Sequence, residues 1–87
     1  MSRIVVHRKA AKYLTSLPHP LRERIKEALA QLSESSLTYP GVIPMSGDWA
    51  GYYRIRIGDF RIVFWFDAGE DVIYVDHIGS RGDVYKN

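Results

Sequence analysis

Three arginines lie within eight residues of one another in the second half of the chain, at Arg54, Arg56 and Arg61. A guanidinium group matches a phosphate with two parallel hydrogen bonds, so this cluster is a candidate anion site. Tyr52 and Trp65 flank it and offer ring faces on which bases can stack. Arginines that hold the backbone beside aromatic rings that stack on bases are typical of single-stranded nucleic-acid binding.

The arginines reach one surface only if their two segments form a β-hairpin. Gly58-Asp59 separates residues 52–57 from residues 60–67, and glycine at the first position of a two-residue loop predicts a type II′ turn. This register places Arg56 opposite Arg61 and Tyr52 opposite Trp65. Alternation then gives one apolar face, made of Tyr53, Ile55, Ile57, Phe60, Ile62, Phe64 and Phe66. The other face carries Tyr52, Arg54, Arg56, Arg61, Val63 and Trp65.

Two guanidinium groups directly opposite each other destabilise a strand pair, so the second face requires compensating negative charge. A phosphate group is one source of that charge. The alternative is that Asp76, Asp83 or the carboxylates of a partner protein neutralise the arginines.

A second polar cluster lies near the C-terminus, where His77, Arg81, Asp83 and Tyr85 fall within nine residues. Histidine can transfer protons near neutral pH, although a lone histidine beside a strand is more often structural. No serine stands in a recognisable nucleophile motif, and the three histidines are scattered along the chain. We therefore expect neither a metal site nor a cofactor.

The elements expected to position these residues form an α+β fold. Residues 3–7 are a β-branched run that predicts a strand, and residues 9–17 have the apolar spacing of an amphipathic helix. A second helix is expected from Pro20 to Leu32, followed by an irregular connection over residues 33–51. Strands at 52–57, 60–67 and 72–78 complete the order β-α-α-β-β-β. We expect an antiparallel helical hairpin on one face of a small, twisted, mainly antiparallel sheet.

Composition limits the chain to a single domain over residues 1–87, because 87 residues are too few for two cores. The absence of cysteine excludes disulfides and suits the reducing cytoplasm, and neither a signal peptide nor a membrane span is recognisable. The net charge is +2, yet seven of the 12 Lys and Arg residues lie in the first 26 positions beside a single acid, Glu23. Lys9, Lys12 and Arg22 are candidate RNA contacts, although charge alone favours solvated helix faces.

Three sequence blocks resemble the RelE/ParE superfamily of type II toxins. They are Leu17-Pro18, Met45-x-Gly47 followed by Gly51-Tyr-Tyr-Arg-Ile-Arg-Ile-Gly-Asp-Phe-Arg-Ile-Val-Phe64, and Ile78-Gly-Ser-Arg-Gly-Asp-Val-Tyr85. The short helices look more like the RelE branch. The resemblance implies an mRNA interferase that inhibits translation by cutting mRNA in the ribosomal decoding site. In this reaction, which needs no metal, the RNA 2′-hydroxyl attacks the adjacent phosphate. By position, the resemblance assigns the site to Arg54, Arg56, Arg61, Arg81 and Tyr85.

The sequence departs from this pattern at Arg54 and Arg56, where well-studied RelE members have lysines and one lysine is thought to take the proton. Arginine stays protonated in proteins and is a poor general base. The candidates for that role are Tyr85, Asp83 and His77, and a tyrosine or carboxylate near the C-terminus is the favoured one. The alternative is that positioning and electrostatic stabilisation supply most of the catalysis.

The resemblance also implies partners, namely a cognate RelB-like antitoxin, the ribosome with its mRNA, and operator DNA only through the antitoxin. Two other functions stay open for the same fold. One is inhibition of DNA gyrase, as in ParE relatives, and the other is an inactive toxin that serves only as a corepressor with its antitoxin.

Overall fold

The structure, a computed structural model, describes residues 1–80. Its elements follow the predicted order of strands and helices, with short additions between them. They are β1 (Arg3–Val6), α1 (Arg8–Thr15), α2 (His19–Ser35), the 3₁₀ turn η1 (Ser36–Thr38), β2 (Ile43–Pro44), the 3₁₀ turn η2 (Gly47–Trp49), β3 (Tyr53–Ile57), β4 (Phe60–Asp67) and β5 (Val72–Ser80). No helix in this range is both long and apolar enough to span a bilayer.

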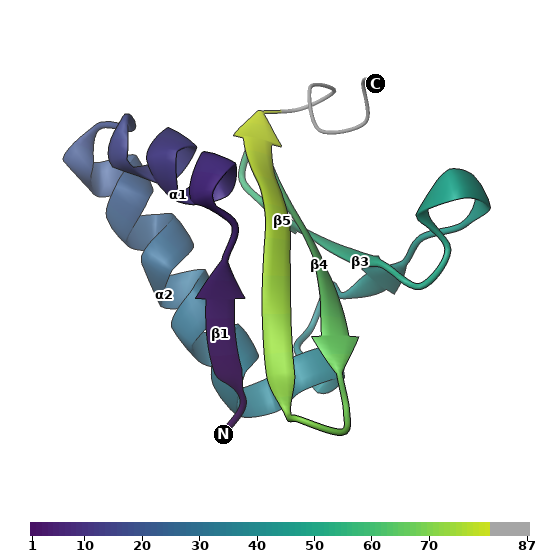
Figure 1. Cartoon of the computed structure of the whole chain (residues 1–87). Helices are drawn as coiled ribbons and strands as arrows, with labels where there is room; N and C mark the ends of the chain where they lie inside the picture. The colour runs from purple at the N-terminus through teal and green to yellow at the C-terminus, as the bar shows by residue number, and fades with distance from the viewer. Residues whose placement is uncertain (81–87) are drawn as a thin grey trace.

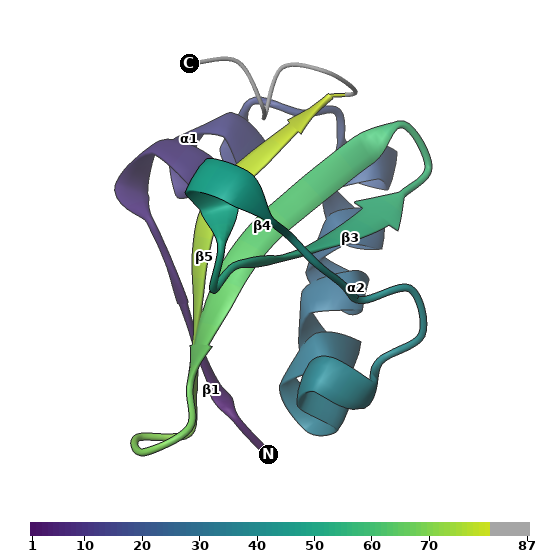
Figure 2. The ribbon, with the colours of Figure 1, turned by 90° about the vertical axis from the view of Figure 1, so that its right-hand side faces the viewer.

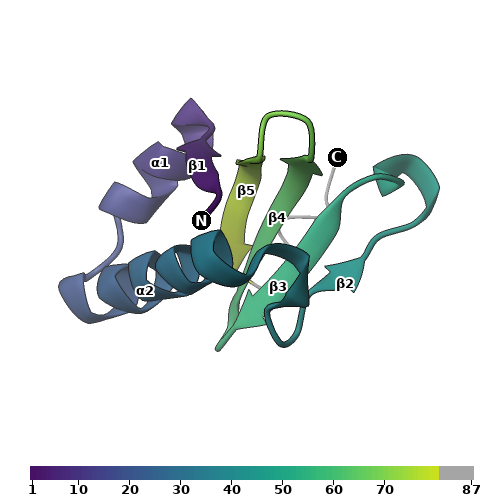
Figure 3. The same cartoon turned by 90° about the horizontal axis from the view of Figure 1, so that it is seen from below.

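The five strands form one mixed sheet in the order β1-β5-β4-β3-β2. Only β1 and β5 run parallel, and the other three pairs are antiparallel. Both helices lie on the same side of this sheet (Figure 1), and the view from below shows α2 running along that face (Figure 3). The α+β fold with a mainly antiparallel sheet is thus confirmed.

The first helix is shorter than predicted at its C-terminal end. α1 ends at Thr15 rather than at Leu17, because the ring of Pro18 disfavours helical backbone at the residue before it. Its N-terminus is capped by the His7 side chain, whose Nδ1 accepts a hydrogen bond from the Lys9 amide at 3.1 Å. At the other end Arg22 donates to the Leu17 carbonyl at 3.3 Å, which links α2 to the end of α1.

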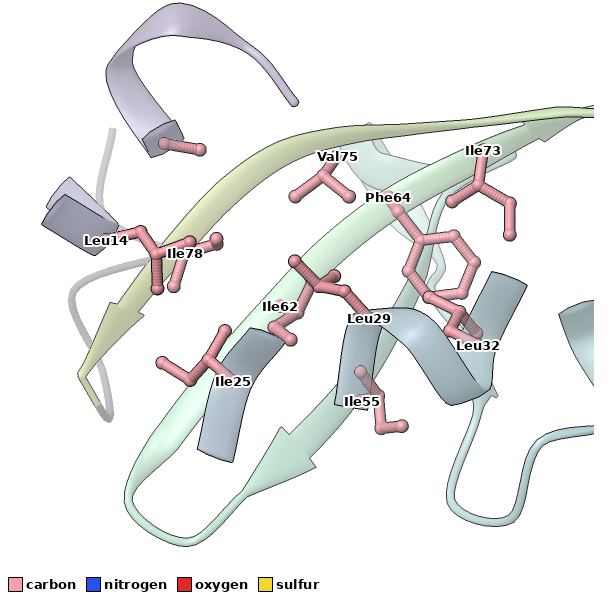
Figure 4. Close-up of a cluster of buried hydrophobic side chains, with 11 residues drawn as sticks. Leu14, Ile25, Leu29, Leu32, Ile55, Ile62, Phe64, Ile73, Val75 and Ile78 are labelled. Carbon is pink, nitrogen blue, oxygen red and sulfur yellow. The ribbon is translucent and has the colours of Figure 1, made fainter. Parts of the chain in front are cut away.

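The core lies between the helices and the sheet face that they cover. Phe64, Ile25 and Ile62 are fully buried at its centre. Figure 4 shows side chains from the helices meeting side chains from three strands, and the cluster comprises Ala10, Leu14, Ile25, Leu29, Leu32, Ile55, Ile62, Phe64, Ile73, Val75 and Ile78. Burial of this apolar surface is what holds the helices to the sheet. The predicted apolar face of the hairpin is confirmed by Ile55, Ile62 and Phe64.

The hairpin has the predicted turn and register. Gly58 has a φ of 59° while Asp59 lies outside the left-handed region, as a type II′ turn requires. Arg56 pairs with Arg61, and Ile55 pairs with Ile62.

The prediction that Tyr52 pairs with Trp65 is wrong, because β3 begins one residue later, at Tyr53. The backbone of Tyr52 is hydrogen-bonded elsewhere. Its carbonyl accepts from the Met45 amide at 2.9 Å, and its amide donates to the Trp49 carbonyl at 3.0 Å. The first bond continues the pairing of β2 with β3, and the second joins Tyr52 to the η2 segment.

The connection over residues 33–51 is more ordered than predicted. It contains η1, η2 and the two-residue strand β2, which pairs with β3 through Ile43 and Arg54. Figure 2 shows η2 in front of β4 and β5, on the sheet face opposite the helices. Part of this loop therefore covers the second face of the sheet.

Candidate functional site

The sheet face opposite the helices, here called the open face, carries the three hairpin arginines. Arg54 and Arg56 extend from β3, and Arg61 extends from β4 directly opposite Arg56. Arg56 is exposed, and Arg54 and Arg61 are half-buried. The Arg56 Nε donates to the Gly58 carbonyl at 3.1 Å, which holds the base of this side chain against the turn. The predicted convergence of these three residues on one face is therefore present in the structure.

Carboxylates of the described residues do not neutralise Arg54 or Arg56. The ion pairs within residues 1–80 lie on α2, where Glu23 is 3.7 Å from Lys26 and 4.0 Å from His19. No ion pair within residues 1–80 joins Asp76 to Arg54 or Arg56, so the predicted alternative fails for these two arginines, and the Asp76 carboxylate instead accepts a hydrogen bond from Tyr52. Asp83, the other carboxylate considered, lies outside the described residues. The two β3 guanidinium groups are thus available to an anion.

A bulge in β5 adds two polar side chains to the open face. Val63 pairs with His77 while the next residue, Phe64, pairs with Val75. Asp76 is therefore an extra residue without a partner in β4. A bulge of this kind interrupts the alternation of side chains, so neighbouring residues turn to the same side. Asp76 and His77 both belong to the open face for this reason, as their contacts with Tyr52 and Trp49 show.

Aromatic rings cover the middle and the far end of the open face. Trp49 of η2 packs edge-on against His77, with ring centroids 5.3 Å apart, and against Tyr52, at 5.2 Å. Trp65 stacks on Tyr74 at 4.5 Å, with the two ring planes 16° apart. Below them Val63 is fully buried although it lies outside the main core cluster. Sequence reasoning missed Trp49 and Tyr74, and a tryptophan in a glycine-containing loop was the available signal for Trp49.

The Tyr52 hydroxyl donates to the Asp76 carboxylate, and this bond raises the pKa of Tyr52 above its ordinary value. Partial burial and the negative charge of Asp76 raise the pKa further, because both disfavour the phenolate. Tyr52 is therefore a hydrogen-bond donor at neutral pH and not a proton acceptor.

The basic residues of the helices lie apart from the arginine cluster. Lys9 and Lys12 are exposed on α1, on the helical side of the sheet (Figure 1). Arg22 is half-buried and donates to the Leu17 carbonyl, so part of its role is structural. The structure thus places the predicted RNA contacts on two different sides of the molecule.

The predicted site residues Arg81 and Tyr85 lie outside the described residues. The last described residue, Ser80, pairs with Phe60, and Gly79 pairs with Arg61. The described part of β5 therefore ends beside the arginine cluster. Within residues 1–80 no group of three or more His, Cys, Asp or Glu side chains is placed to hold a metal ion.

Several solved structures share this fold. The RelE–RelB complex of the archaeon Pyrococcus horikoshii OT3 matches with a TM-score of 0.80 and 28% identity, covering 94% of this chain and 97% of that chain. Isolated Escherichia coli RelE matches with a TM-score of 0.77 and 21% identity, over 98% and 92% of the two chains. YafQ from Escherichia coli BL21(DE3) matches at 0.78 with 13% identity, over 99% and 100%. At 21% and 13% identity, the similarity to these last two proteins shows a shared fold and nothing about activity.

The sequence also matches a family model, whereas the comparison with curated proteins returns no match. The model describes the ParE toxin of the type II toxin–antitoxin system parDE, and it covers residues 4–85 of this chain. That span contains both helices, the arginine cluster and all of the sheet except Arg3. The chain therefore belongs to the ParE toxin family, within the RelE/ParE superfamily of type II toxin–antitoxin toxins.

Proposed function

We propose that this toxin is a ribosome-dependent mRNA endoribonuclease. The observation that carries the proposal is the pair Arg54 and Arg56, which share one exposed face and have no carboxylate partner within residues 1–80. Arg61 extends from the neighbouring strand opposite Arg56. Three guanidinium groups on one surface favour a substrate whose negative charge is spread over several oxygens, as it is in a phosphodiester.

In the proposed reaction the RNA 2′-hydroxyl attacks the adjacent phosphorus and expels the 5′-oxygen of the next nucleotide. Negative charge accumulates on the phosphate oxygens as the new bond forms. Preorganised guanidinium groups stabilise that charge more strongly than they stabilise the starting diester, and this difference accelerates the reaction. We assign this role to Arg54, Arg56 and Arg61, with Arg81 and Tyr85 added on the basis of the family resemblance.

The aromatic side chains favour single-stranded RNA as the form bound. Trp65 and Tyr52 are half-buried on the open face, and each has a ring neighbour that holds it in place. A base that is unstacked from its neighbours can lie on such a ring. Lys9, Lys12 and Arg22 face away from this site, and we assign them to contacts with ribosomal RNA.

We also propose a RelB-like antitoxin as the partner of this toxin. Similar RelE chains from Pyrococcus horikoshii and Methanococcus jannaschii form complexes with RelB antitoxins. The open face joins Arg54 and Arg56, which have no carboxylate partner within residues 1–80, to aromatic rings, so it offers charge and apolar area to an acidic segment that folds on binding. In this proposal the toxin reaches operator DNA only through the antitoxin.

The test uses the purified toxin on ribosomes programmed with a defined mRNA, with new 5′ ends mapped by primer extension. We expect cleavage within codons by the wild type. The double variant Arg54→Ala, Arg56→Ala should lower the rate by about a hundredfold or more, the typical effect of removing groups that stabilise transition-state charge. The control Arg8→Ala, Lys26→Ala removes the same charge from exposed helix positions and should cleave at the wild-type rate. Absence of cleavage by the wild type would refute the proposal.

Inhibition of DNA gyrase is the second candidate. The observations that favour it are the match to the ParE family model and the absence of lysine from the open face of β3. A supercoiling assay with purified gyrase separates the two functions. A toxin that blocks supercoiling and leaves programmed ribosomes intact acts as a gyrase inhibitor.

A further inference from the structure

His77 lies in the same cross-strand row as Arg54. Arg54 pairs with Val63 across β3 and β4, and Val63 pairs with His77 across β4 and β5. Two strand spacings separate the Cα atoms of Arg54 and His77 by about 10 Å, with both side chains on the open face. The side chain between them is the small, fully buried Val63. Arg54 and His77 therefore lie at the two ends of one cross-strand row on the face proposed to bind the phosphodiester.

A ring contact orients His77. Its imidazole packs edge-on against Trp49, and Trp49 in turn packs edge-on against Tyr52. The ring is otherwise exposed. An imidazole that is held on one side and open on the other can meet a substrate without rearrangement of the fold.

Arginine and tyrosine side chains of the open face are unsuited to accept a proton near neutral pH. Arg54, Arg56 and Arg61 keep their charge at all accessible pH values. Tyr52 is held neutral by its hydrogen bond to Asp76. Asp76 is half-buried beside Tyr52, whereas His77 is exposed. Within residues 1–80 His77 is therefore the accessible group on this face whose chemistry fits general-base catalysis near neutral pH.

We propose that His77 is the general base of the reaction, an inference that rests on the proposed function. The imidazole nitrogen takes the proton of the 2′-hydroxyl while the 2′-oxygen forms its bond to phosphorus. The bond from phosphorus to the 5′-oxygen breaks, and the departing oxygen takes a proton from water. The products are a 2′,3′-cyclic phosphate and a 5′-hydroxyl, and His77 then returns its proton to solvent. This assignment replaces the C-terminal tyrosine or carboxylate favoured from sequence.

The pH profile of this step depends on the charged and titratable groups that face His77. On the open face they are Asp76 and Tyr74 on β5, Arg54 and Arg56 on β3, Arg61 on β4 and Tyr52 before β3, and η2 contributes Asp48, the residue before Trp49. Among them, neither the arginines nor Tyr52 change charge near neutral pH. A rate that rises with pH through the ionisation of an imidazole is therefore the expected signature.

The test measures single-turnover cleavage on programmed ribosomes between about pH 5 and pH 8, the range in which an imidazole changes its charge. His77→Gln should lower the rate by about a hundredfold, the typical contribution of a positioned base, and should abolish the rise with pH. His19→Gln is the matched control, since His19 is an exposed histidine on α2, and it should keep both the wild-type rate and profile. Imidazole added to His77→Ala should restore part of the activity.

Each result has one meaning. A His77→Gln variant that keeps the wild-type rate and pH profile overturns the assignment. So does a rate that falls equally at all pH values without rescue by imidazole, because this pattern belongs to a structural role. If Tyr85→Phe loses the pH dependence and His77→Gln keeps it, the role of general base belongs to Tyr85 and not to His77. A wild-type protein that cleaves no mRNA refutes the proposed function itself and the His77 assignment with it.

Discussion

The ionisation of Tyr52 reports on a contact of the open face, because Tyr52 donates a hydrogen bond to Asp76. The pKa of Tyr52 is raised in the folded state, chiefly by that bond. The bond therefore stabilises the fold fully below the ordinary pKa of a phenol, about 10, and its contribution is lost as the pH rises through the raised pKa.

We expect Tyr52 to titrate late among the six tyrosines. Absorbance titration of the phenolates should show a high-pH component that Tyr52→Phe removes and that Asp76→Asn moves to lower pH. Tyr74→Phe, on the same face, is the control and should leave this component in place. A late component that persists in Tyr52→Phe would show that the contact with Asp76 does not control the titration.

At the scale of elements, the hairpin was the most predictable part of the site. A two-residue turn and simple alternation determine which side chains share a face, and both are local properties of residues 52–67. The bulge at Asp76 was not predictable, because residues 72–78 read as an uninterrupted strand and only pairing with β4 reveals the extra residue. The place of Trp49 depends on how a long loop returns to the sheet, which local sequence does not specify. His77 was one of three candidate bases from the sequence, but its position in one row with Arg54 and its contact with the Trp49 ring emerged only from the structure.

Gly58 links the turn of the hairpin to α2. Its φ of 59° is a conformation that residues with a side chain rarely adopt. A Cβ at this position would also lie 3.1 Å from a terminal nitrogen of Arg24. Gly58→Ala should therefore lower the free energy of unfolding by about 1 to 3 kcal/mol, the usual cost of a strained backbone.

Denaturant unfolding measures this loss, and Gly69→Ala provides the control. Gly69 lies in the β4–β5 turn without a left-handed φ, and an added Cβ would make only an ordinary contact of 3.5 Å with Asp67. Equal stability of the two variants would show that the Gly58 turn tolerates a side chain.

At the scale of the whole molecule, a small polar network joins three distant segments. Ser2, which is 4% exposed, donates from its hydroxyl to Asp71 at 2.6 Å and lies 2.8 Å from the Ser36 hydroxyl. Its backbone amide donates to the Ser33 carbonyl at 2.8 Å. These hydrogen bonds connect the segment before β1 to the end of α2 and to the β4–β5 turn. Asp71 and Ser36 both have positive φ, so these contacts hold two unfavourable backbone conformations in place.

Ser2→Ala should destabilise the protein by about 1 kcal/mol, the net contribution of a typical hydrogen bond. The control is Ser46→Ala, since Ser46 is exposed and its side chain caps no helix. Thermal unfolding of the two variants should show a lower Tm for Ser2→Ala alone. Cleavage by Ser2→Ala should stay at the wild-type level, because the network lies outside the open face. An unchanged Tm would mean that water replaces the lost bonds without cost.

The pairing of β1 with β5 also bears on when the proposed site assembles during synthesis of the protein. The ribosome makes β1 first, yet its partner in the sheet is the last strand of the described chain. The β3–β4 hairpin can form as soon as it leaves the exit tunnel, whereas contacts between segments distant in sequence form late. His77 lies on β5, so it joins the arginines only after nearly the whole domain has emerged. Under the proposed function, a nascent chain whose β5 has not yet emerged lacks the assembled site, and we expect it to leave its own message uncut.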